Sequence, residues 1–288
     1  MTEKKKRGFL YTLRGCQNCT CLPTLGRLPL LKKLFIESLN GFKRLGPELL
    51  GHADSCNDIA FSLLEVLEFR DMQDWEEWSM SGADKDGIVG LFPCLRKISI
   101  ENCLKLNVVV IDSIPSLEVL HVKGSLVTVL RSMVGLSSSI VTLTMEDIKG
   151  LTQLDGEIVE HLQKVEYLSI SKCAEVTNLW ESELNNLVSL QTLKVSECVN
   201  LVSLVERKVD LVICGMSSIR EVEIINCLKL EGYNCTNSIE KLKIDNCDSM
   251  TSLTFPQLDK NLPSTFKFLK LKDCDNLEVN WVFSNLLS

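Results

Sequence analysis

One twelve-residue pattern constrains the fold of this chain more than any other feature of the sequence. Between Leu190 and Leu201 the pattern has apolar residues at Leu190, Leu193, Val195, Cys198 and Leu201. Leu193 and Val195 are two residues apart and therefore lie on one face of a short strand. The three-residue steps on either side cannot continue a strand on that face, so the chain must turn there. The pattern predicts one coil of a stack, which buries its apolar side chains only against its neighbours.

The same pattern recurs along the whole chain. Its eleven inward-facing pairs are Tyr11/Leu13, Leu34/Ile36, Leu67/Phe69, Ile98/Ile100, Leu120/Val122, Leu143/Met145, Leu168/Ile170, Leu193/Val195, Val222/Ile224, Leu242/Ile244 and Leu269/Leu271. From Cys16 to Cys274 ten steps average about 26 residues, a period typical of leucine-rich repeats. We therefore predict an α/β solenoid, a leucine-rich-repeat horseshoe with one parallel concave sheet of about 11 short strands and an irregular, loop-rich convex side.

Composition and charge limit the possible partners and cellular locations of the chain. We expect residues 1–7 to form a basic, disordered segment and residues 8–288 to form the repeat domain. The formal net charge of −7 argues against binding to nucleic acid or to anionic lipid. No apolar segment near Met1 resembles a signal peptide, and the longest wholly apolar run, from Val108 to Ile111, is too short to span a membrane. A cytoplasmic location is expected, with a nuclear one as the alternative because residues 4–7 are all basic.

The cysteines are expected to be structural. Seven of the thirteen occupy the position just after the strand, where a small buried thiol can donate a weak hydrogen bond to a carbonyl. The sequence from Cys16 to Cys21 contains a C-x-x-C, but no second pair follows at ligand spacing, so a structural role is favoured over a zinc or redox site. The sequence has no phosphate-binding glycine motif. We therefore expect no cofactor, no metal and no enzymatic activity.

The residues between and beside each inward pair should face outward on the sheet. They carry both signs of charge, with glutamates early in the chain and lysines near its end. We consider them candidates for protein binding, against the alternative of an ordinary solvated sheet face. The candidates are Phe35, Glu37, Glu68, Arg70, Ser99, Glu101, His121, Lys123, Ser169, Lys194, Glu223, Lys243, Lys270 and Lys272.

Two tryptophans, Trp75 and Trp78, flank two glutamates just after the third strand. One interpretation places both indoles inside the coil, where Trp75 takes the inward leucine position. The other makes them exposed aromatic anchors on the rim, since Trp is enriched at interface hot spots. Burial is the favoured interpretation, and both residues remain candidate rim anchors.

Three stretches resemble a known family. Cys16–Pro29, Asp71–Trp78 and Phe92–Cys103, in this order and separation, are similar to the leucine-rich-repeat region of plant coiled-coil-type nucleotide-binding leucine-rich-repeat (NLR) disease-resistance proteins. The resemblance implies a repeat region that senses a pathogen effector or a guarded host protein and restrains a nucleotide-driven switch. Because the chain lacks the switch's phosphate-binding motif, we expect a fragment lacking that domain.

The resemblance therefore implies a non-catalytic recognition module whose concave face binds a protein ligand or a nucleotide-binding domain absent from this chain, with no nucleic-acid or membrane partner. An alternative is the substrate-recognition repeat region of a ubiquitin-ligase adaptor, whose repeats also contain cysteine and have a similar period. Against it, no F-box-like helical segment precedes the first coil.

Overall fold

The computed structural model describes residues 9–16, 18–51, 59–80, 91–180, 187–205, 218–255 and 266–277. They fall into two compact units, Met1–Val141 (unit 1) and Thr142–Ser288 (unit 2). Residues 1–7, expected to be disordered, lie outside the described residues. Each unit is described by itself below.

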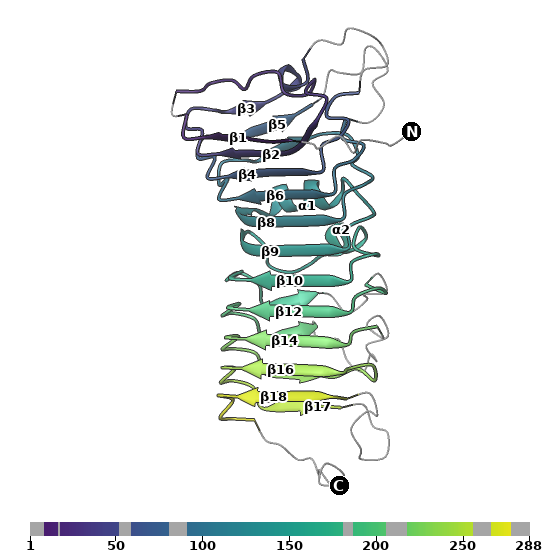
Figure 1. Ribbon diagram of the computed structural model, residues 1–288. Helices are drawn as coiled ribbons and strands as arrows, with labels where there is room; N and C mark the ends of the chain where they lie inside the picture. The colour runs from purple at the N-terminus through teal and green to yellow at the C-terminus, as the bar shows by residue number, and fades with distance from the viewer. Residues whose placement is uncertain are drawn as a thin grey trace, which may run out of the picture. The chain divides into compact units, whose positions relative to one another are not determined.

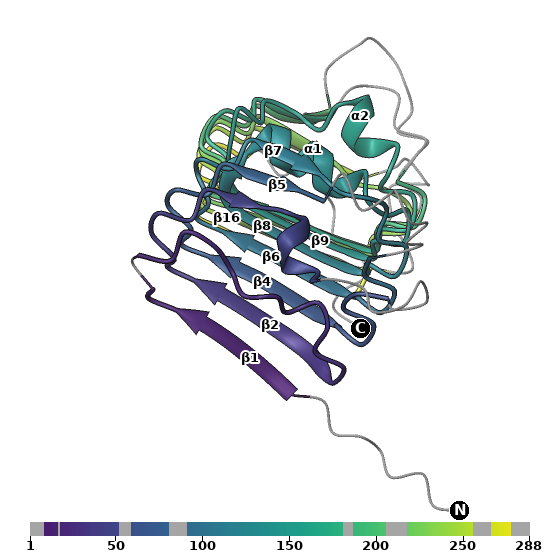
Figure 2. The same ribbon diagram turned by 90° about the horizontal axis from the view of Figure 1, so that it is seen from above.

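Unit 1 contains five parallel strands that pair in chain order (Figures 1 and 2). They are β1 (Phe9–Arg14), β2 (Leu31–Glu37), β4 (Val66–Arg70), β6 (Lys97–Glu101) and β8 (Val119–Leu126). Their register aligns each predicted inward pair with the next, so that Leu34 lies beside Leu67 and Leu67 beside Ile98. Each rung is therefore one turn of the predicted coil.

Unit 2 contains six parallel strands that also pair in chain order. They are β9 (Thr142–Lys149), β10 (Tyr167–Ser171), β12 (Thr192–Ser196), β14 (Glu221–Ile225), β16 (Lys241–Asp245) and β18 (Phe268–Lys272). Leu168, Leu193 and Val222 are in register, and all three are at most 2% exposed. The two units together supply eleven strands, and the predicted parallel leucine-rich-repeat solenoid is confirmed.

The side of the coils opposite the main strands is more regular than expected. In unit 1, β3 (Arg44–Leu45), β5 (Glu77–Ser79) and β7 (Val108–Val110) form a second, short parallel sheet (Figure 2). In unit 2, β11 (Asn178–Trp180) pairs with β13 (Ser203–Val205), and β15 (Gly232–Asn234) with β17 (Ser252–Thr254). Three-residue strands are too short to show a sequence period, which is why the pattern missed them.

Three short helices complete the described part of that side: η1 (Pro47–Leu49), α1 (Val127–Val134) and α2 (Gly156–Val159). The eight-residue α1 was not predicted. It buries Val129, Leu130, Met133 and Val134, which are three or four apart and so form one apolar face. Asp155 caps α2, because its carboxylate accepts a hydrogen bond from the Ile158 N–H.

The turn after each main strand depends on one backbone conformation. The residue before the cysteine position has a positive φ between 50 and 55° in ten coils, most often at Asp or Asn, which tolerate it best. Its N–H continues the ladder to the next coil, as from Asp71 to the Glu101 carbonyl at 2.9 Å. The cysteine thiol then donates to a carbonyl two residues back, as from Cys103 to Glu101 at 3.3 Å. The predicted thiol hydrogen bond is confirmed.

Gly124 takes this left-handed position in the fifth coil, with φ +53°. A Cβ added there would lie 2.7 Å from Asn102 Oδ1, whose amide donates to Asp71 Oδ1 at 2.8 Å. We expect Gly124→Ala to lower the free energy of unfolding by more than about 1 kcal/mol, since it adds both strain and a clash. The matched control is Gly156→Ala at the start of α2, where an added Cβ meets nothing within 4 Å. Urea unfolding of both variants checks this; equal effects would contradict it.

The two tryptophans lie in the core of unit 1. Trp75 and Trp78 are both 0% exposed and pack on Phe69, with ring centroids 4.5 and 5.1 Å from that of the phenylalanine. The candidate role as exposed rim anchors is therefore wrong, and the favoured interpretation of burial is confirmed. The physical reason is that Phe69 points inward from β4, while Trp75 covers it from the following turn and Trp78 from β5.

Candidate functional site

Three columns of side chains line the exposed face of the main strands, which we call the sheet face. The second column runs through Thr12, Phe35, Glu68, Ser99 and His121 in unit 1, and through Thr144, Ser169, Lys194, Glu223, Lys243 and Lys270 in unit 2. The third runs through Arg14, Glu37, Arg70, Glu101 and Lys123, and through Glu146, Ser171, Ser196, Ile225, Asp245 and Lys272. The sequence predicted both columns in register.

Sequence reasoning missed a first column at the amino ends of the strands. In unit 1 it contains Lys33, Val66, Lys97 and Val119, and in unit 2 Thr142, Tyr167, Thr192, Glu221, Lys241 and Phe268. The signal was available, because these residues precede the inward pair by one and alternate with it. Phe268 matters most here, since 48% of this aromatic residue is exposed.

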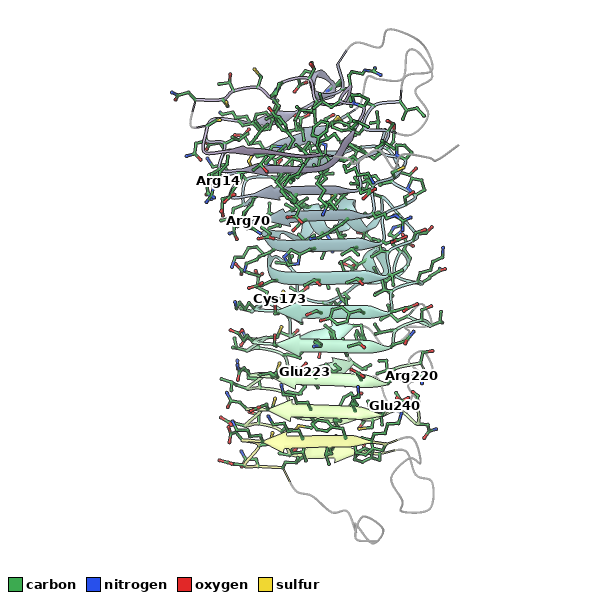
Figure 3. All side chains as sticks on the ribbon, in the orientation of Figure 1. Arg14, Arg70, Cys173, Arg220, Glu223 and Glu240 are labelled. Atoms are coloured by element: carbon green, nitrogen blue, oxygen red, sulfur yellow. The ribbon has the colours of Figure 1, made fainter. Side chains whose placement is uncertain are left out.

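The third column of unit 1 alternates in sign from rung to rung. Arg14 Nε lies 3.3 Å from Glu37, and Arg70 makes two hydrogen bonds to Glu101, at 2.9 and 3.1 Å. Figure 3 shows Arg14 and Arg70 at the carboxyl ends of their strands. Burial raises the pKa of Glu101, but the hydrogen bonds and charge of Arg70 outweigh it and hold that pKa below its ordinary value. The early glutamates are thus largely neutralised within the sheet face.

Ser99 is a correction to the set of candidate binding residues. Its side chain is short, and its hydroxyl donates to Glu101 Oε1 at 3.1 Å. In register it lies between Glu68 and His121, whose longer side chains flank it. Ser99 is therefore only 2% exposed and is not available to a partner.

In unit 2 a chain of ion pairs runs along the second column. Glu223 accepts from Lys243 at 2.5 Å and from Lys194 at 3.1 Å, on the rungs to either side. The hydrogen bond from Lys243 lowers the pKa of Glu223 most, with Lys194 adding to it against the effect of burial. Lys194 Nζ also lies 5.9 Å from the centroid of the Tyr167 ring, a cation–π distance. These contacts hold the central side chains in fixed positions.

A hollow of about 160 Å³ opens on this part of the sheet face. Its lining comes from β12, β14, β16 and β18, through side chains of the first and second columns and through Val222. A second ion-pair ladder at the amino ends of the same strands joins Glu240 to Arg220 at 2.8 Å and to Lys267 at 2.6 Å (Figure 3). Charged ladders therefore border the hollow region of unit 2.

Of the sheet-face lysines near the end of unit 2, Lys270 is paired least tightly. Lys270 and Lys272 lie 3.7 and 3.6 Å from one carboxylate, that of Asp245. Lys272 also donates to Asp273 at 2.8 Å. The sheet face of β16 and β18 thus carries four lysines and one aspartate on a chain whose total charge is −7. This is the most positive part of the sheet face that the structure describes.

Three curated proteins share stretches of sequence with the chain. It is 36% identical over 113 residues to disease resistance RPP13-like protein 1 of Arabidopsis thaliana, and 33% identical over 105 residues to a second disease resistance protein of that plant. It is 28% identical over 159 residues to disease resistance protein RGA1 of Solanum bulbocastanum. The relatives of this chain are plant disease resistance proteins. The predicted resemblance is confirmed at this level.

These disease resistance relatives are much longer than the chain. The matches cover 38%, 36% and 55% of the chain, but 10%, 7% and 15% of the relatives. No family model matches. A leucine rich cell surface protein of Faecalibacterium prausnitzii aligns over 78% of this chain and 86% of its own, at 10% identity and a TM-score of 0.14. That score is too low to support an argument, so the fold rests on the strand register.

Three further features of the described ranges bear on metal, thiol and membrane sites. No group of three or more His, Cys, Asp or Glu within them could hold a metal ion. Cys16 and Cys19 of the C-x-x-C are partly exposed, and the hydrogen bond that the Cys19 thiol donates to Cys16 raises the pKa of Cys19. No helix among the described residues is long and apolar enough to cross a membrane. The sheet face is therefore the candidate site that the described residues define best.

Proposed function

We propose that this chain is a non-catalytic protein-recognition module of the plant immune type. It binds its partner on the sheet face, in the cytoplasm or the nucleus. The partner is a pathogen effector, a host protein, or a nucleotide-binding domain of a longer polypeptide. The names of the relatives support the immune setting and favour this proposal over a ubiquitin-ligase adaptor.

The fixed positions of its side chains support the sheet face as the binding surface. Within each unit its side chains lie in register on strands that hydrogen-bond to their neighbours, and ion pairs between rungs fix the side-chain positions. A surface held in this way loses little conformational entropy on binding. It also presents the aromatic side chains of Phe35, Tyr167 and Phe268, a residue class that is enriched in the cores of protein interfaces.

The proposal is tested by proximity labelling in leaf cells, with a biotin ligase fused to the chain. The triple variant Phe35→Ala, Tyr167→Ala and Phe268→Ala removes the aromatic side chains of the sheet face. We expect it to reduce biotinylation of direct partners at least tenfold, because hot-spot truncations typically cost about 2 kcal/mol or more.

The matched control is Leu104→Ala, Val110→Ala and Val188→Ala, which removes apolar side chains that are 50%, 50% and 56% exposed but lie outside the sheet face. It should leave the labelled proteins unchanged. Equal losses in the two variants, or none in the first, would contradict binding at the sheet face. Recovery of a ubiquitin-ligase adaptor as the main partner would favour the alternative function.

A further inference from the structure

The hollow of unit 2 is a trough between two columns of the sheet face. One wall is the second column, where Glu223 bridges Lys194 and Lys243. The other is the first column, where Glu221 and Lys241 form an ion pair. Between these columns lies Val222, whose side chain points inward and is 2% exposed, so it lines the hollow through its backbone. The apolar part of the lining comes from Phe268 and from the aliphatic stems of the lysines and glutamates.

An aromatic side chain lines one end of the trough. Phe268 lies in register with Lys241 on the next rung and is among the residues lining the hollow. An exposed phenylalanine contributes favourable free energy when a second apolar group covers it, at roughly 25 cal/mol per Å² of apolar surface buried. The trough therefore offers one place where an apolar side chain of a partner can be buried.

The volume of the hollow indicates which kind of ligand can fit into it. Its volume of about 160 Å³ lies below the roughly 300–1,000 Å³ of small-molecule and cofactor pockets. A hollow of this size accepts one anchoring side chain of a polypeptide. The flat sheet face around it then contacts the residues on either side of that anchor.

The lysines around the hollow favour acidic partner residues on either side of the anchoring side chain. Lys243 and Lys270 are neighbours on the second column, and Lys241 lies beside Phe268 on the first. Lys270 lies 3.7 Å from Asp245, beyond hydrogen-bond distance, so its ammonium retains donors for another carboxylate. Lys243 donates to Glu223, but an ammonium group has three N–H donors and can pair with a second carboxylate. Carboxylates that flank an anchor in the trough would meet this lysine-rich end.

We propose that the trough binds an acidic peptide segment of a protein partner, in which one aromatic or branched aliphatic side chain enters the hollow and neighbouring Asp or Glu side chains pair with Lys243 and Lys270. This inference rests on the proposed function and specifies the partner's chemistry. The anchor is buried against Phe268 and the aliphatic stems that line the hollow, and the flanking carboxylates provide the orientation.

Fluorescence anisotropy with the purified chain and short labelled peptides tests this. The first peptide has one phenylalanine between two runs of three acidic residues. In the second, alanine replaces the phenylalanine, and in the third, lysines replace the acidic residues. We expect the first to bind at least tenfold more tightly than either of the others, because it alone supplies both anchor and charge. Its affinity should fall as salt is raised to about 0.15 M and beyond.

Chain variants locate the binding. Phe268→Ala and Lys270→Glu should each weaken the first peptide about tenfold, while Lys33→Glu, the same charge change on the exposed first column of unit 1, should not. Circular dichroism of each variant establishes that it is folded. Equal binding of the phenylalanine and alanine peptides would overturn the inference, as would equally effective competition by heparin, which would indicate a general polyanion surface.

The outcomes separate this inference from the proposed function. If no peptide binds but the triple aromatic variant still loses its partners in leaf cells, the acidic-anchor inference fails and recognition by the sheet face stands. If the peptide binds as expected but that variant keeps all its cellular partners, the proposed function fails, and with it the biological role of the trough.

Discussion

The free energy of unfolding is expected to fall steeply between about pH 8.5 and 10. Burial raises the pKa of the Cys103, Cys173 and Cys227 thiols to about 12, and that of Cys198 and Cys247 to about 11. In the unfolded chain a cysteine titrates near 8.5. Above that pH the unfolded state releases protons that the folded state retains, so stability is full below about pH 8.5 and is lost as pH rises towards the folded pKa values.

The expected size of the effect is large. Each thiol contributes up to about 1.4 kcal/mol per pH unit, and five acting together set an upper limit of about 7 kcal/mol per unit. That is comparable to the whole stability of a typical domain, about 5–15 kcal/mol. Four of the five buried thiols lie in unit 2, and only Cys103 lies in unit 1. Unit 2 should therefore unfold at the lower pH.

Urea unfolding under reducing conditions at several pH values measures this. Cys173→Ala should reduce the pH slope by up to about 1.4 kcal/mol per unit. The control Val176→Ala truncates another buried side chain of the same coil, so it should lower stability at every pH and leave the slope unchanged. A free energy of unfolding that stays level from pH 8.5 to 10 would contradict the role of the buried thiols.

The strands and their register follow from the sequence because they depend on local spacing. An inward pair two residues apart, repeated eleven times, fixes both the face and the alignment of each rung. The left-handed turn can also be recognised in the sequence, because Asp71, Asn102 and Asn226 directly precede the cysteine position. The period alone therefore predicts where two of the three columns of the sheet face lie.

What the sequence does not predict is which side chains on that face remain available. Glu223 meets Lys194 and Lys243, which are 29 and 20 residues away, and these contacts depend on rotamers that no period encodes. Ser99 seemed exposed by its alternation, yet its neighbours bury it. The position of Phe268 at the end of the trough likewise depends on the stacking of four rungs.

The second large effect concerns the aromatic cluster of unit 1. Trp75→Ala should lower the free energy of unfolding by about 3–5 kcal/mol, because it removes a fully buried indole that packs on both Phe69 and Trp78. Chemical denaturation monitored by far-UV circular dichroism measures this. A loss below about 1 kcal/mol would show that the cluster is not a rigid part of the core.

Substitutions with phenylalanine separate packing from hydrogen bonding in the same cluster. Trp75 Nε1 donates to the Glu77 carbonyl at 2.8 Å, whereas Trp78 Nε1 is buried and has no hydrogen-bond partner. Trp75→Phe leaves that carbonyl without its donor, which costs about 1–3 kcal/mol beyond the change in volume. Trp78→Phe makes the same change in volume but removes an unsatisfied donor. We therefore expect Trp75→Phe to be the more destabilising by at least about 1 kcal/mol, and equal losses would show that the Trp75 hydrogen bond contributes nothing to stability.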